Sequence, residues 1–195
     1  RNVLLEVEKT PAQPGAPILQ IQDLVVHDER GVPVVEGVNL ELFSGEILGL
    51  AGVQGNGQTE LVEALTGLRE VETGRIRING QDMTNASPRQ ITEAGTAHVP
   101  EDRQKAGMVG AFSVMKNMVL NTYHKLPFSK GILVDDDAIA ANARELVERY
   151  DVRPTNIYNN ASGLSGGNQQ KVIVAREFSR PIKLMIASQP TRGLD

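Results

Sequence analysis

The stretch GVQGNGQTELVEAL, residues 52–65, has the spacing of a phosphate-binding loop that runs into a helix. Such a loop needs small residues, because its backbone N–H groups must wrap around phosphate oxygens while the positive end of the helix dipole faces the anion. Gly52, Gly55 and Gly57 meet the first need, and apolar residues at helical spacing after residue 58 meet the second. The apolar run EILGLAG just before the loop predicts a buried parallel strand.

The position that normally carries a lysine in such a loop holds Gln58. The next residue, Thr59, stands where a hydroxyl would ligate magnesium. Taken alone, the stretch is therefore also compatible with a glycine-rich turn between a strand and a helix that binds nothing.

The remaining pattern alternates strands with helices and predicts an α/β fold. Two antiparallel strands are expected in ILQIQDLVV and VVEGVNLELF, and GRIRING predicts a strand that ends in an Asn-Gly turn. Ser87 and Pro88 predict the start of a short helix. Further expected elements are a strand at 96–99, a helical segment from 113 to 158 with a cap at 135–137, a helix ending near 178 and a buried strand in IKLMIAS.

Length and composition limit the function classes. The 195 residues suit one domain, or one domain with a small insertion; PAQPGAP marks residues 1–17 as a linker before a domain at 18–195. The net charge of −4 and the lack of a basic run argue against nucleic-acid binding. The sequence has no cysteine, which excludes disulfides and cysteine metal sites. It has no stretch of about 18 apolar residues, so no direct membrane insertion is expected.

A second glycine motif, LSGGNQQK at 164–171, places Ser165, Gly166 and Gly167 at another helix start. The apolar strand LMIAS and the loop PTRGLD follow it. With these motifs in this order, the sequence resembles the ATP-binding cassettes of ABC transporters from Ile18 onward. The form of the second motif, with PTRGLD and the linker before the domain, is similar to the second cassette of the double-cassette ATPases of sugar and nucleoside importers.

The resemblance implies a P-loop NTPase-type core with an antiparallel β subdomain and an inserted α-helical subdomain at about 113–160, truncated at the C-terminus so that the sheet is incomplete. It implies ATP and Mg²⁺ as cofactors. The partners implied are a second cassette, in the same full-length chain, and membrane-spanning permease subunits that hold the protein on the cytoplasmic face of the membrane. The residues implied in nucleotide binding are Gly52, Gln54, Gly55, Asn56, Gly57, Gln58, Thr59, Ser165, Gly166 and Gly167.

Four positions depart from the family pattern in their reactive side chains. Gln58 replaces the lysine, Ser188 the magnesium-site aspartate, Gln189 the catalytic glutamate and Glu101 a glutamine that contacts magnesium and water. The first three changes raise the local charge by one, so nucleotide binding can survive, whereas phosphoryl transfer depends on the lost charges. This half is expected to be weakly active or inactive alone and to supply residues 165–167 to a partner site.

Three alternatives fit the same residues. The altered positions are also what engineered changes in an active enzyme would produce. A structural or regulatory nucleotide-binding module without hydrolysis, or a soluble ABC-type protein that acts on DNA or ribosomes, would carry similar motifs. The acidic composition and the importer-like second motif argue against the last of these.

Overall fold

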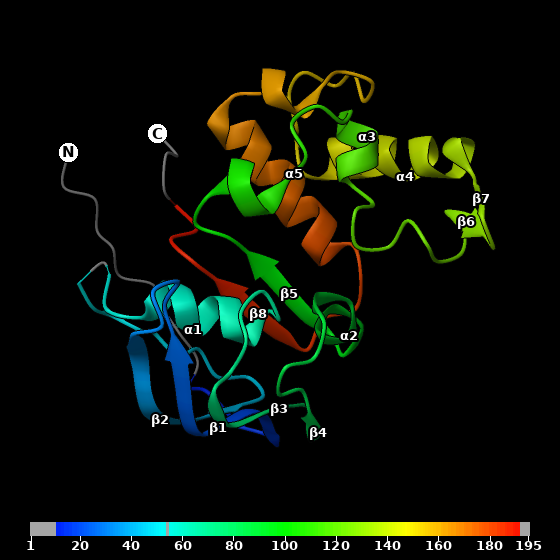
Figure 1. The fold of residues 1–195 in the computed structure, drawn as a ribbon. Helices are drawn as coiled ribbons and strands as arrows, with labels where there is room; N and C mark the ends of the chain where they lie inside the picture. Colours follow the sequence, from blue (N-terminus) through cyan, green and yellow to red (C-terminus); the bar gives the residue numbers. More distant parts are fainter. Residues whose placement is uncertain (1–10, 54, 192–195) are drawn as a thin grey trace. The chain divides into compact units, whose positions relative to one another are not determined.

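The computed structural model describes residues 11–53 and 55–191, which form two compact units. The first unit comprises the chain up to Ala64 together with Arg69–Asn85, and the second comprises Leu65–Leu68 and the chain from Ala86 onward. Figure 1 shows the order of their elements along the chain. The predicted bounds of a linker at 1–17 and of a helical subdomain at 113–160 stay predictions.

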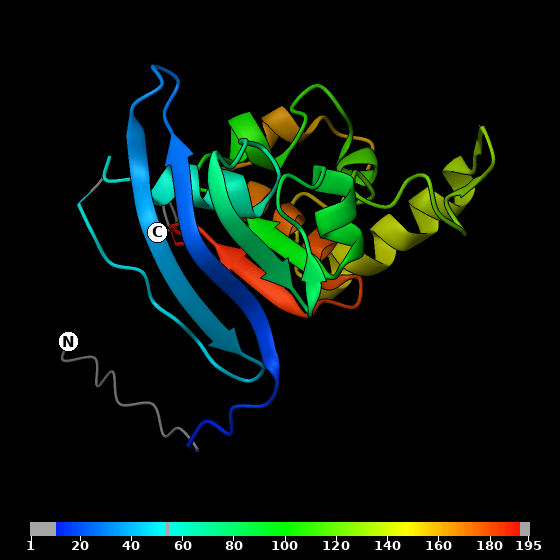
Figure 2. The ribbon, with the colours of Figure 1, turned by 60° about the horizontal axis from the view of Figure 1, so that its bottom comes forward.

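The first unit contains an antiparallel sheet with the strand order β2-β1-β3-β4. The long strands β1 (Pro17–His27) and β2 (Pro33–Phe43) pair as predicted, and both are prominent in Figure 2. β3 (Thr73–Ile78) pairs with the other side of β1, and a turn at Asn79 and Gly80, both with positive φ, connects it to β4 (Gln81–Asp82). The Asn-Gly prediction is thereby confirmed, since two positive φ angles define this class of hairpin turn.

A bulge in β1 keeps the apolar side chains of this strand buried. Its register shifts between Ile21 and Leu24, where Asp23 adopts a left-handed φ of 46°. The extra residue lets the side chains before and after it bury on one face, although they are spaced by three instead of two. Asn39 of β2 fixes the bulge, because its Oδ1 accepts from the Asp23 amide at 3.0 Å and its Nδ2 donates to the Asp23 carboxylate at 2.9 Å.

The predicted buried strand before the glycine loop is wrong. Residues 46–51 have no strand hydrogen bonding, and Ile47 is 95% exposed. An apolar run is suited to burial, but a strand forms only where neighbouring strands accept from its N–H groups and donate to its C=O groups. The helix predicted after the loop is confirmed as α1 (Gln58–Leu65), and Gly67, with a φ of 74°, follows its end.

The second unit is built around two parallel strands, β5 (Thr96–Val99) and β8 (Leu184–Ala187), with Thr96 opposite Leu184. Helix α5 (Gly166–Phe178) packs on β5, and α2 (Pro88–Glu93) precedes this strand. α2 begins as predicted, because Ser87 and Gln90 form a reciprocal capping box. β8 was expected to be buried, yet only Leu184 is fully so, since among the described residues β8 pairs with β5 alone.

The segment expected to be helical contains two helices and a small hairpin. α3 (Val114–Asn117) is one turn long, and α4 (Asp136–Arg149) begins at the predicted cap, where the Asp135 side chain accepts from the Ala138 amide at 2.9 Å. Between them lie turns and the hairpin of β6 (Ser129–Lys130) and β7 (Leu133–Val134). The turn η1 (Arg103–Gly107) has π-helical bonding, and η2 (Ala161–Gly163) is a 3₁₀ turn.

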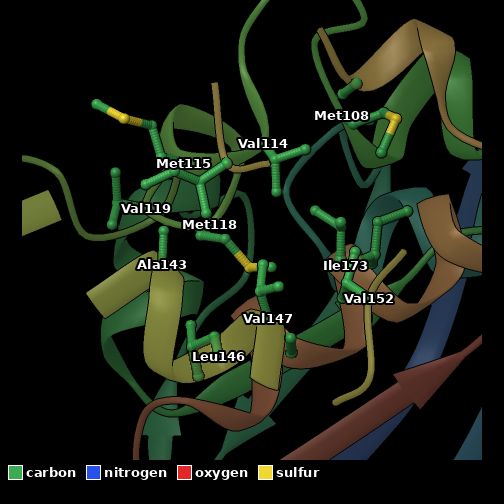
Figure 3. Close-up of a cluster of buried hydrophobic side chains, with 14 of the residues drawn as sticks. Met108, Val114, Met115, Met118, Val119, Ala143, Leu146, Val147, Val152 and Ile173 are labelled. Carbon is green, nitrogen blue, oxygen red and sulfur yellow. The ribbon is translucent and has the colours of Figure 1, made fainter. Parts of the chain in front are cut away.

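The core of the second unit gathers side chains from α3, α4 and α5, as Figure 3 shows. Val114, Met118, Leu146 and Ile173 are among its buried members. Burial of such aliphatic side chains contributes about 1.5–3 kcal/mol each, so this cluster stabilises the packing of α3 and α4 against α5, which carries the second glycine motif. Within the described part of the chain, no helix is long and apolar enough to cross a bilayer.

Candidate functional site

The glycine loop at 52–57 is shaped by two residues with left-handed backbone. Gly55 and Gly57 have φ values of 91° and 87°, a region that side chains other than glycine rarely adopt. A Cβ at Gly57 would also collide with the backbone carbonyl of Val34 in β2. Gly57 is therefore required by the approach of a strand as well as by its φ. Gln54, predicted to contact nucleotide, lies outside the described residues.

Gln58, which replaces the expected lysine, folds back over the loop. Its Nε2 donates to the Val53 carbonyl at 3.3 Å, and a Cβ at Gly52 would collide with the same amide group. The side chain therefore closes the loop on itself. A neutral amide in this position contributes a hydrogen-bond donor but no positive charge, which weakens the attraction for phosphate.

The first turn of α1 leaves the predicted metal ligand accessible. Thr59 is exposed at the second position of the helix, and Asn56 is exposed in the loop before it. The Leu61 amide donates to the Gly57 carbonyl at 2.9 Å, which ties the loop to the helix. The first amide groups of a helix have no acceptor within it, so this end presents donors to an anion.

The second glycine motif forms a capped helix start. Ser165 is the N-cap of α5, and its Oγ accepts from the Asn168 amide at 3.4 Å and from Asn168 Nδ2 at 3.0 Å. The Asn168 Oδ1 in turn accepts from the Arg153 amide at 2.7 Å. Gly166 and Gly167 are the first helical residues and are half-buried. Their backbone groups are held in place by the capping network.

Two consecutive glutamines of the motif, to which sequence reasoning assigned no role, are buried. Gln169 is 4% exposed and donates to the Ala161 and Leu164 carbonyls at 3.3 and 3.2 Å. Gln170 is 6% exposed and donates to the Pro190 carbonyl at 3.1 Å. The sequence contained one signal for their burial: they are polar residues at helix positions where apolar core residues would be expected.

A charged contact holds the same helix from the outside. Lys171 Nζ lies 2.7 Å from the Asp151 carbonyl oxygen and 3.1 Å from its carboxylate, while Arg153 contacts that carboxylate at 2.8 Å. The hydrogen bonds from Lys171 and then Arg153 lower the pKa of Asp151 below its ordinary 3.8. Because these groups are exposed, the pair adds little stability and mainly fixes orientation.

The loop after β8 carries two of the altered positions. The Ser188 amide donates to the Val99 carbonyl at 2.9 Å, which extends the parallel pairing by one bond. Its Oγ is buried without a hydrogen-bond partner. Gln189 is exposed and has a φ of 45°, a left-handed conformation that costs a non-glycine residue about 1 kcal/mol. The predicted catalytic position therefore points outward from a constrained turn.

Glu101 lies beside the second motif in the folded chain. It lines a cavity of about 190 Å³ with Asp102, Arg103, Gln104 and Gln169. The Asp102 carboxylate caps η1 by accepting from two backbone amides at 3.0 Å. The second unit therefore brings Glu101 close to the buried glutamine of α5, whereas the loop residues Gly52 to Thr59 gather in the first unit.

The far end of α5 is anchored by a buried carboxylate. Glu177 is 2% exposed and accepts from Arg176 Nε at 3.0 Å, Arg180 at 2.9 Å and Asn121 Nδ2 at 2.7 Å. Burial lowers the pKa of Arg176, opposed by the adjacent Glu177. Burial also lowers the pKa of His98 in β5. The contact with Asn121 joins α5 to the residues after α3, and the His98 amide of β5 donates to the Glu177 carboxylate at 3.5 Å.

The donor set for magnesium is poor. Among the described residues, no group of three or more histidine, cysteine, aspartate or glutamate side chains could hold a metal ion. Mg²⁺ is usually bound by one or two carboxylates together with substrate phosphates. Thr59 and Ser188 offer hydroxyls, and the latter is a buried oxygen without a partner. Within the first unit, Thr59 fits a metal ion only where phosphate oxygens supply most of its ligands.

Comparison with solved structures places the fold. A dimeric bacterial ABC transporter cassette, MJ0796, superposes with a TM-score of 0.74 at 20% identity, covering 91% of this chain and 76% of that one. The ATP-binding cassette MJ1267 of an ABC transporter gives a TM-score of 0.71 at 21% identity, covering 93% of this chain and 72% of that one. The predicted cassette fold, α/β with an antiparallel sheet and helices, is thereby confirmed.

Sequence relatives and a family model identify the chain. The nucleoside import ATP-binding protein NupA of Lactococcus lactis is 50% identical and the guanosine import ATP-binding protein NupO of Bacillus subtilis 47% identical, each over the whole chain. The glucose import ATP-binding protein TsgD13 of Haloferax volcanii is 43% identical over the same length. The chain spans 36–38% of the length of these relatives. Since the ABC transporter family model matches residues 35–192, the chain belongs to the ABC transporter family.

Proposed function

We propose that this chain is part of the ATPase of an ABC importer for nucleosides or sugars. Residues 164–167 of its second glycine motif are called the signature turn. The chain supplies this turn to the active site of a partner cassette. The relatives named for nucleoside, guanosine and glucose import support the transport class. The substrate of the whole protein, its permease subunits and its place on the cytoplasmic face of the membrane are part of this proposal.

The observation that carries the proposal is the contrast in side-chain chemistry between two helix starts. The signature turn keeps its glycines, its serine cap and a supporting network around Ser165 and Asn168. The loop at 52–59 keeps its glycines but has an amide at Gln58 that bonds inward. A cassette with this distribution of residues is suited to stabilising phosphate held by another chain segment more than to reacting with its own.

In the proposed arrangement, Ser165, Gly166 and Gly167 meet the outer phosphate of ATP held by the partner. Backbone donors aimed at developing negative charge stabilise a phosphoryl-transfer transition state without reorganising. ATP also binds weakly at Gly52 to Thr59, with Thr59 the residue that would hold Mg²⁺. Gln189 and Glu101 stand at degenerate catalytic positions, so this half contributes binding more than chemistry.

A non-hydrolytic regulatory module is the second candidate, and the inward bond of Gln58 favours it. In that case the pocket would bind nucleotide and the signature turn would be dispensable for turnover. The two candidates differ in what happens when the signature turn is blocked.

The test is Gly166→Asp in the complete protein assembled with its membrane subunits, with Gly163→Asp as the matched control. Gly163 lies three residues upstream in open space, so the same charge is added beside the turn but not in it. Gly166→Asp should lower steady-state phosphate release by about a hundredfold or more, since one lost transition-state donor costs about 3 kcal/mol. Nucleotide binding, followed by the amide shifts of Gly55, Gly57 and Thr59, should be unchanged. Turnover close to that of the parent would refute the role of the signature turn.

A further inference from the structure

Gln170 connects the signature helix to the loop that follows β8. Its side chain is 6% exposed and its Nε2 donates to the Pro190 carbonyl at 3.1 Å, 20 residues further along the chain. A proline carbonyl is the only hydrogen-bonding group of its backbone unit, because proline has no N–H. A buried amide aimed at this oxygen therefore fixes the position of the loop.

The residue that this contact constrains is Gln189, the position before Pro190. Its left-handed φ of 45° persists only where neighbouring contacts impose it. One such contact precedes it, where the Ser188 amide donates to the Val99 carbonyl of β5 at 2.9 Å. The other follows it, at Pro190, and comes from α5. The exposed Gln189 is thus held between a strand of the sheet and the signature helix.

The neighbouring glutamine makes the equivalent contact on another side of the helix. Successive helical residues differ in direction by about 100°, so Gln169 and Gln170 face different segments. Gln169 donates to the carbonyls of Ala161 and Leu164, which lead into the signature turn. One buried glutamine therefore holds the segment before the turn, and the other holds the loop after β8.

We propose that Gln170 is a positioning residue that makes the signature turn and the loop at 188–191 move as one piece. When a partner cassette binds at the signature turn and displaces it, the loop that contains Gln189 moves together with the turn. The functional part of this inference rests on the proposed role of the signature turn. The physical link between the two segments does not depend on that role.

The direct test measures amide hydrogen exchange at Ser188 and at the segment 161–167 in the complete protein without nucleotide. Gln170→Met keeps the length and apolar character of the buried chain but removes the donor. It should speed exchange of the Ser188 amide by about threefold to tenfold, the effect of losing one net hydrogen bond, and leave 161–167 within twofold of the parent. Gln169→Met is the matched control and should give the opposite pattern.

A second variant separates the hydrogen bond from packing. In Gln170→Glu, the ionised carboxylate cannot donate to the Pro190 carbonyl, whereas its protonated form can. Because the side chain at this position is buried, the pKa of the new carboxyl is raised above the ordinary value of about 4.3, into the range of the pH series. The ratio of variant to parent exchange rates cancels the intrinsic pH dependence, and it should fall toward one as the pH is lowered from 8 to 5. For Gln170→Met the ratio should stay constant. If Gln170→Met does not fold, as judged by circular dichroism, this pH series carries the test.

Two results would overturn the inference. One is a Ser188 exchange rate in Gln170→Met within twofold of the parent, and the other is a ratio for Gln170→Glu that does not change with pH. Turnover gives a separate reading: Gln170→Met should lower kcat about twofold to tenfold with little change in KM for ATP. Normal turnover by Gly166→Asp would instead refute the proposed function and leave the exchange result standing.

Discussion

The two glycine-rich helix starts of this chain differ in backbone and in supporting side chains: left-handed glycines precede α1, whereas a capping serine in extended conformation precedes α5. In the loop at 52–57, Gly57 allows the close approach of Val34, and Gln58 donates to the carbonyl of Val53. At the signature turn, a capping serine, an asparagine and the buried Gln169 hold the helix start, while Gln170 joins the same helix to the loop after β8. Backbone geometry suited to an anion is thus present in a loop whose expected lysine position holds a glutamine. The start of α5 is the more firmly held of the two, because side chains and backbone groups from several segments contact it.

Introducing the charged groups expected from the family resemblance should have the largest effect. The triple change Gln58→Lys, Ser188→Asp and Gln189→Glu adds the cation, the metal carboxylate and the catalytic carboxylate that the resemblance implies. In the complete protein, with the partner cassette's own phosphate loop inactivated, phosphate release should rise by at least about a hundredfold. Each single change should have little effect, because such groups act as a unit. Brisk turnover of this chain alone with Gln58→Lys would contradict this view of the loop after β8.

The glycine requirement of the loop is the next strongest test. Gly57→Ala should lower the free energy of unfolding by roughly 2 to 4 kcal/mol, because the new Cβ meets the Val34 carbonyl and the φ is unfavourable. Gly55→Ala is the matched control, with a similar φ but open space around it, and should cost about 1 to 2 kcal/mol. Urea denaturation measures both. Equal losses would mean that contact with β2 does not shape the loop.

The serine cap offers a comparison within the second unit. Ser165→Ala and Ser113→Ala each remove an N-cap acceptor, at α5 and α3, and each should cost about 1 kcal/mol of unfolding free energy. Only Ser165→Ala should also lower ATP turnover by the complete protein. A similar fall in turnover for both would point to loss of stability as the cause.

The charged contact of the signature helix predicts the smallest effect. Lys171→Met should raise the pKa of Asp151 toward 3.8, because the hydrogen bond from Lys171 is the main cause of its lowering. A lowered carboxylate pKa stabilises the fold above about pH 4, and this stabilisation is lost as the pH falls through the folded value. The variant should therefore lose less stability on acidification. Titration of the Asp151 carboxyl by NMR measures the shift, and Arg153→Met should move it less.

Local signals predicted the elements whose stability is local. The helix starts at Ser87, Asp135 and Ser165 follow from side chains that satisfy the first free amides, which a short sequence window contains. The Asn-Gly turn follows from the positive φ that its two residues tolerate. The strand predicted in 46–51 failed because a strand depends on partners elsewhere in the chain.

The residues of the candidate site likewise fall into those that local sequence patterns predict and those that depend on tertiary packing. The glycines and caps could be read from their spacing, whereas the acceptors of Gln169 and Gln170 lie up to 20 residues away and depend on tertiary packing. The cavity beside Glu101 likewise needs η1 and α5 to lie together, which no local pattern specifies. The bulge at Asp23 left a trace in the sequence, a spacing of three between apolar residues, but its position became clear only from the pairing with β2.

The bare apolar run before the phosphate loop has a consequence for handling the chain. Ile47, Leu50 and Val53 are 95%, 57% and 75% exposed, within a stretch that has little charge and no proline. A backbone without strand pairing that carries exposed apolar side chains can pair with the same segment of another molecule and so promote aggregation. Samples of this chain should therefore associate more as concentration rises, and Ile47→Lys should delay precipitation without altering either glycine motif.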